Sequence, residues 1–153
     1  MKPNHNQEAK SCTSDFYSLL VGIIMFFLSS CGNNVIGFNP ETNTVYTIDN
    51  YPISSLEINM EKSKMFFSIV KIDSTEGSTC IKIDSLGDNY KIEPIKKFKA
   101  PMGKNVPMLP LETYEIYHSS IGDAAACIIY LLTDKTGRVK QVMSRYEYEN
   151  QNN

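Results

Sequence analysis

The chain has 153 residues, with 15 basic and 17 acidic side chains, so its formal net charge is −2 at pH 7. A balance this close to neutral does not indicate nucleic-acid binding, which calls for a strongly basic surface. Hydrophobic residues make up 42% of the chain, and a chain of this length predicts one domain with a real core.

The N-terminal segment contains an uncharged apolar run, FYSLLVGIIMFFL, at residues 16–28. Its length is typical of a signal-peptide core and is short for a transmembrane helix. The run ends in the order Leu28-Ser29-Ser30-Cys31, and the polar residues 32–34 follow. The alternative is an uncleaved membrane helix, made by extending the apolar run to Ile36.

This order resembles the lipobox of bacterial lipoproteins, in which the signal peptide is cut directly before a cysteine that carries the lipid. The resemblance covers residues 1–34 and implies cleavage between Ser30 and Cys31, with lipid on Cys31. Two or three acyl chains would make the attachment effectively permanent. Gly32 after the cysteine implies, by the same resemblance, an outer-membrane position facing the periplasm, with the cell surface as the alternative.

The predicted organisation follows from this assignment. Residues 1–30 form the signal peptide, 31–42 the lipidated cysteine and a polar tether, 43–148 a β-domain, and 149–153 a polar tail. Small and polar residues dominate the predicted tether, which is typical of a flexible linker.

Two cysteines remain in the predicted domain, Cys80 and Cys127. An oxidising compartment would allow them to form a disulfide. The alternation of Cys80 with Ile81 and Ile83 instead places Cys80 toward water, while Cys127 lies in an apolar run. Two unpaired thiols are therefore the alternative.

A period of two dominates the chain after residue 43 and predicts strands. The expected strands lie at 44–49, 56–60, 65–73, 80–84, 90–92 and 113–119. Three prolines and a glycine in residues 101–110 predict a loop or an irregular edge.

Residues 125–133 are apolar on both faces and are compatible with a central strand or with a helix capped by Asp123. The turn-like sequence at 134–137 favours a strand that enters a hairpin, with a final strand at 138–148. Seven or eight short strands predict an all-β fold, a small β-sandwich with an immunoglobulin-like arrangement as one form. A small β-barrel, or an α+β fold with a helix over 124–132, is the alternative.

The predicted domain has one histidine, His118, which shares a strand face with Tyr114 and Ile116. A single histidine without a neighbouring cluster of cysteines or acids does not provide enough ligands for a zinc site, so we predict neither a metal nor a cofactor. A hydrolase that combines His118 with Ser119 or Ser120 and Asp123 is disfavoured, because adjacent strand residues point to opposite faces. We assign no catalytic residue.

A run of lysines, interrupted only by Glu93, is the main charge feature of the domain. Its centre, Lys96, Lys97 and Lys99, is a candidate contact for anionic lipid head groups, an acidic polysaccharide or an acidic protein. The alternative is a solvated sheet edge that lysines protect against pairing. The run comprises Lys91, Lys96, Lys97, Lys99 and Lys104.

Together these features predict a lipid-anchored cell-envelope protein, a non-enzymatic binding or accessory module that contacts another envelope protein or a glycan. A second class is an envelope hydrolase or enzyme inhibitor with an unrecognised site. A third class is a structural subunit of a surface assembly, in which the strand at 90–95 or the C-terminal strand pairs with a neighbouring subunit.

Overall fold

The computed structural model describes residues 34–119 and 126–152, which fold into two antiparallel β-sheets and one short helix. The three-stranded sheet has the order β1 (Ile36–Asn39), β2 (Thr44–Thr47), β5 (Cys80–Lys82). The six-stranded sheet has the order β6 (Tyr90–Pro94), β4 (Met65–Lys71), β3 (Ser55–Met60), β7 (Thr113–His118), β8 (Cys127–Thr133), β9 (Val139–Ser144). Helix α2 (Arg145–Asn152) ends the described chain.

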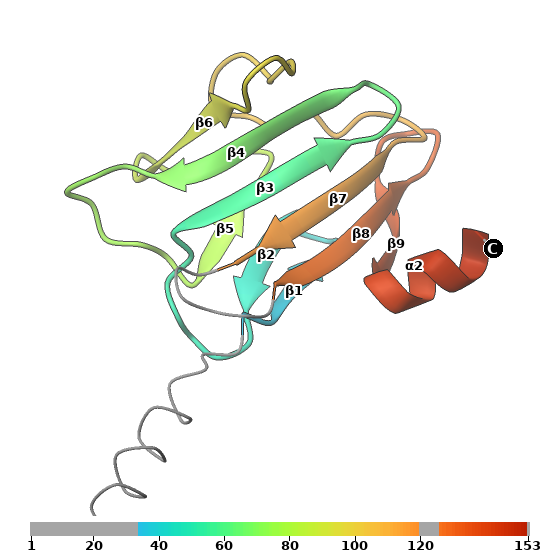
Figure 1. Ribbon diagram of the computed structural model, residues 1–153, viewed down its shortest axis with the longest axis horizontal. Coiled ribbons are helices and arrows are strands. Elements are labelled where there is room, and N and C mark those ends of the chain that lie inside the picture. The colour runs from blue at the N-terminus through green and yellow to red at the C-terminus, as the bar shows by residue number, and fades with distance from the viewer. Residues whose placement is uncertain (1–33, 120–125, 153) are drawn as a thin grey trace, which may run out of the picture. The chain divides into compact units, whose positions relative to one another are not determined.

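The core lies between the inner faces of the two sheets (Figure 1). Strict alternation places Leu56, Ile58 and Met60 of β3 inside, and each of them is fully buried. Phe38 of β1 and Val45 of β2 belong to the same hydrophobic cluster. The all-β sandwich is thus confirmed, with two separate sheets rather than a small barrel. The α+β alternative is wrong, because Cys127–Thr133 form a strand.

The N-terminal boundary of the domain differs from the prediction, because residues 36–39 of the expected polar tether form β1. Ile36 and Phe38 alternate with smaller or polar residues and are buried in the core. The ring of Tyr46 covers Gly37, so that a Cβ there would lie 2.4 Å from Cζ of Tyr46 and the ring would have to move aside. The boundary was misplaced because β1 is short and contains a glycine, so its composition is similar to that of a flexible linker.

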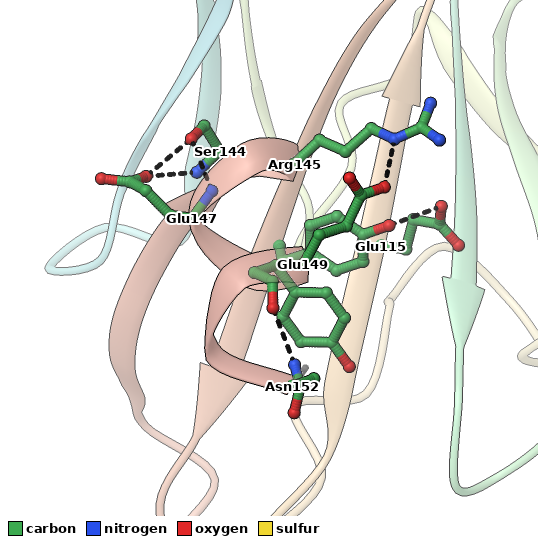
Figure 2. Close-up of polar contacts among 8 residues, drawn as sticks. Glu115, Ser144, Arg145, Glu147, Glu149 and Asn152 are labelled. Carbon is green, nitrogen blue, oxygen red and sulfur yellow. Dashed lines mark hydrogen bonds and ion pairs between the residues drawn. The ribbon is translucent and has the colours of Figure 1, made fainter.

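The predicted C-terminal strand is confirmed over Val139–Ser144 but extends too far, because helix α2 occupies residues 145–152. Ser144 and Glu147 form a capping box: Glu147 Oε2 accepts hydrogen bonds from Ser144 N at 2.7 Å and from Ser144 Oγ at 2.8 Å (Figure 2). An i,i+4 ion pair, with Arg145 Nε 2.7 Å from Glu149 Oε1, supports the first turns of the helix.

Residues 101–110 carry no strand, as their prolines predict, and side chains of the six-stranded sheet hold this segment in place. Tyr114 Oη accepts a hydrogen bond from Leu109 N and donates one to Pro107 O, both at 2.6 Å. Thr133 Oγ1 donates to Leu109 O at 2.7 Å. The irregular segment is therefore fixed by hydroxyl groups that project from β7 and β8.

Candidate functional site

An open hollow of about 350 Å³ lies on the outer face of the six-stranded sheet. Because side chains alternate along a strand, the burial of Ile58 directs its neighbours Glu57 and Asn59 away from the core. The same alternation on β7 directs Glu115 and Tyr117 outward. We call this site the sheet-face hollow, and its lining residues are Glu57, Asn59, Phe66, Phe98, Glu115 and Tyr117.

Two phenylalanines form one wall of the sheet-face hollow. Phe66 of β4 and Phe98 meet edge to face, with ring centroids 5.4 Å apart and ring planes at 79°. The backbone fixes this contact, since Phe66 N donates to Lys99 O and Phe98 N donates to Ile95 O, both at 3.0 Å. Phe98 nevertheless remains 54% exposed, so an aromatic residue faces solvent at a defined position.

The floor of the hollow carries two carboxylates on neighbouring strands. Register pairs Glu57 with Tyr117 and Asn59 with Glu115, so the two glutamates are diagonal neighbours, which in a sheet lie about 7–8 Å apart. Glu115 Oε2 accepts a hydrogen bond from Asn59 Nδ2 at 3.0 Å, and Glu115 Oε1 accepts one from Tyr130 Oη at 3.0 Å. Within residues 34–119 and 126–152, neither carboxylate forms a direct ion pair, although Arg145 of α2 lies near enough to interact electrostatically with Glu115.

Helix α2 contacts the tyrosine that donates a hydrogen bond to Glu115. Tyr148 stacks on Tyr130, with ring centroids 4.0 Å apart and an interplanar angle of 5°. Tyr148 Oη also donates to Glu61 Oε1 at 3.0 Å. Burial and the hydrogen bond to Glu115 raise the pKa of Tyr130 to about 12. The phenol is therefore a hydrogen-bond donor to Glu115 over an even wider pH range than an ordinary tyrosine.

The predicted lysine run divides into two parts. Lys91 pairs with Glu93 at 2.6 Å and Lys104 pairs with Asp88 at 2.6 Å. Lys96, Lys97 and Lys99 are exposed on the segment that supplies Phe98, and no ion pair holds them in the described part of the chain. Three exposed lysines thus lie within two residues of Phe98 in the chain, on the segment that supplies the aromatic wall of the hollow.

The other predicted site residues lie elsewhere. His118 is buried on the inner face with Tyr114 and Ile116, as expected, and its Nδ1 lies 3.1 Å from Ser55 O. Ser120 and Asp123, the other members of the disfavoured triad, lie outside the described residues. Cys31 and Ser30 of the lipobox also lie outside them.

The two domain cysteines do not pair. Cys80 and Cys127 are both free, with Cys80 exposed on β5 of the small sheet and Cys127 half-buried on β8 of the large one. The structure therefore adopts the alternative of two unpaired thiols.

The sequence pattern does not identify the polar residues of the sheet-face hollow. Glu57, Asn59 and Glu115 stand at outward-facing positions of alternating strands, but ordinary solvent-facing residues stand at such positions too. A second, larger hollow of about 570 Å³ lies between the β1–β2 and β8–β9 turns, but its described lining contains no aromatic side chain.

Comparison of the chain with protein-family models, with curated proteins and with solved structures finds no match in any of the three. Among the residues that the structure describes, no helix is long and apolar enough to cross a bilayer. In the same residues, no group of three or more His, Cys, Asp or Glu side chains is placed to hold a metal ion.

Proposed function

We propose that this protein is a lipid-anchored module of the bacterial cell envelope, attached through Cys31, whose sheet-face hollow binds a positively charged side chain of another envelope protein. The lipobox resemblance supports the address and the anchor. The hollow supports the binding role, and the observation that carries it is the combination of two carboxylates with exposed aromatic rings on one rigid sheet face.

The chemistry of the hollow suits a cation. The faces of Phe66, Phe98 and Tyr117 carry partial negative charge and attract an ammonium or guanidinium group. Carboxylates form the strongest hydrogen bonds with these groups, and arginine can engage them in a bidentate manner. Asn59 and Tyr130 already hold Glu115 in position, so binding costs little further ordering of this side chain.

The free lysines specify what surrounds the cation. Lys96, Lys97 and Lys99 would repel a uniformly basic segment and attract acidic residues beside the bound side chain. The favoured ligand is therefore an arginine or lysine flanked by acidic residues. Anchoring of both proteins in one envelope raises the local concentration, so a weak contact would suffice.

The anchor is tested by the intact mass of the membrane-extracted chain beside a Cys31→Ala variant. We expect the chain to lack residues 1–30 and to be heavier than the remaining polypeptide by its acyl chains, because the lipobox directs both steps. The variant should show neither change. An unmodified full-length mass in both samples would contradict the proposed anchor.

Binding is tested with the full chain in detergent and a blocked tripeptide, acetyl-Glu-Arg-Glu-amide, with saturation-transfer difference NMR as the readout. The matched ligand control replaces arginine with citrulline, which is isosteric and neutral. We expect the arginine peptide to bind and the citrulline peptide not to bind. The affinity of the Glu57→Gln/Glu115→Gln variant for the arginine peptide should be lower by about tenfold or more, the loss expected for charged hydrogen bonds.

The matched protein control is Glu93→Gln, which removes one carboxylate outside the hollow and should change binding less than twofold, about 0.4 kcal/mol. Equal binding of the two peptides would contradict the proposal. Binding of a neutral oligosaccharide such as maltotriose, without binding of the arginine peptide, would overturn it in favour of a glycan ligand.

One observation favours a second candidate, an envelope hydrolase, since a pair of carboxylates in one hollow can provide general acid–base catalysis. The sheet-face hollow is open to water, however, and two neutral donors hold Glu115 as an acceptor. This environment suits a binding carboxylate better than a proton donor. Fragments of the peptide or the oligosaccharide in the same NMR samples would support the hydrolase.

A further inference from the structure

The outer face of the three-stranded sheet carries an exposed apolar surface. Val35 lies opposite Ile48, with Ile48 N donating to Val35 O at 3.0 Å, and Tyr46 lies across Gly37. After the following turn, Tyr51 O accepts a hydrogen bond from Thr47 Oγ1 at 2.8 Å. Because the Thr47 side chain points inward, this bond places the backbone of Tyr51 beside the end of β2, next to the outer-face residues and not among them. We call this surface the anchor-side patch, and it comprises Val35, Tyr46, Ile48 and Tyr51.

The exposure of the patch is unusual for residues of these types. Ile48 is 57% exposed and Tyr51 64%, while the alternate residues Ile36 and Val45 are buried in the core. The register of β1 and β2 thus places Ile36, Phe38 and Val45 on the buried face of the sheet and Tyr46 on its outer face. Several exposed apolar side chains close together suit an interaction site better than isolated ones do.

The position of the patch in the sequence identifies its partner. Val35 follows Cys31 by four residues, and four fully extended residues span at most about 14 Å. A lipid on Cys31 fixes that residue at the bilayer surface, so Val35 cannot lie farther away than this reach. Tyrosine is enriched at membrane interfaces, where its ring is buried and its hydroxyl meets water.

We infer that the anchor-side patch rests on the lipid bilayer, with Ile48 and Tyr51 at the boundary between head groups and acyl chains. This inference rests on the proposed lipid anchor. It adds a second contact that fixes the orientation of the domain, whereas a lipid on a flexible tether would leave the domain free to turn.

The absence of tryptophan from the sequence permits a direct test with single tryptophan substitutions in the full chain. Tyr51→Trp reports on the patch. The matched control is Tyr146→Trp, which makes the same substitution at another exposed tyrosine, on α2. Each protein is reconstituted into vesicles of phosphatidylethanolamine and phosphatidylglycerol with brominated acyl chains, which quench tryptophan fluorescence on contact.

We expect fluorescence of the Tyr51→Trp protein to fall by about half or more, because interfacial side chains penetrate to the acyl-chain boundary, while that of Tyr146→Trp changes little. Equal quenching of the two, in samples whose intact mass shows the lipid, would overturn the inference and leave the anchor standing. If the fluorescence of the Tyr51→Trp protein changed with protein concentration and not with bromination of the lipid, the inference would also be overturned, in favour of contact with a second copy of the chain. A mass without lipid and no quenching would remove the anchor and the inference together.

Discussion

Replacement of Glu112 with alanine should lower the free energy of unfolding by about 3 kcal/mol, because it removes the shared acceptor of three backbone N–H groups, of which that of Thr113 is buried. Glu112 is 2% exposed. Its carboxylate accepts hydrogen bonds from Lys62 N at 2.8 Å, Ser63 N at 2.9 Å and Thr113 N at 2.9 Å. It thus joins the β3–β4 turn to the start of β7.

Urea unfolding of the Glu112→Ala variant measures this loss, and Glu93→Ala is the control. Glu93 is an exposed glutamate of β6 whose removal should cost about 0.5 kcal/mol or less. The free energy of unfolding of the intermediate variant Glu112→Gln should fall by about 2 kcal/mol, because the NH₂ of its amide would face a backbone N–H group and cannot accept a hydrogen bond from it. A loss for Glu112→Ala no larger than that of the control would contradict the assigned role.

The same carboxylate makes stability depend on acid. Burial alone would raise the pKa of Glu112, but the three backbone donors outweigh burial and hold its pKa below the usual value of 4.5. A depressed pKa adds stability above the unfolded value and loses it as the pH falls through the folded value. The Glu112→Gln variant should therefore lose less stability than the natural chain between about pH 5 and pH 3.

Substitution of Gly137 by alanine should destabilise the fold by about 3 kcal/mol, from backbone strain and a steric clash together. Gly137 has a φ of 85°, and a Cβ there would lie 2.4 Å from the carbonyl oxygen of Met108. Met108 belongs to the segment held by Tyr114 and Thr133, so its backbone is not free to retreat.

Gly103 provides the control for this prediction. It has the same φ of 85°, but a Cβ there would meet no heavy atom within 4 Å. Gly103→Ala therefore measures the strain alone, about 1 kcal/mol, and the difference between the two variants in urea unfolding isolates the clash. Equal losses would show that the Met108 backbone moves aside at little cost.

Local pattern predicts the strands of this fold where one face is buried. Leu56, Ile58 and Met60 alternate with polar residues, and β3 appears where the alternation places it. Helix α2 was predictable from Ser144 and Glu147, which stand at capping-box spacing. The two tyrosines at alternate positions in this segment, Tyr146 and Tyr148, favoured a strand and obscured that signal.

The candidate site could not be predicted, because it depends on pairing between distant strands. Asn59 and Glu115 are 56 residues apart and meet only because β3 pairs with β7. Neighbouring strands in the sheet are not neighbours in the chain at this point, and alternation does not specify which strands become partners. Phe98 joins the hollow from an irregular segment that carries no periodic signal at all.

The two outer faces of the sandwich point in opposite directions, and each has its own surface: the anchor-side patch on the small sheet and the hollow on the large one. Stacked sheets are separated by about 10 Å. A domain lying on the membrane by its small sheet would hold the hollow above the bilayer at that height plus a layer of side chains. Molecules lying flat among the head groups could not reach it, whereas a protein that rises from the same leaflet, or one that approaches from the aqueous side, would meet it directly.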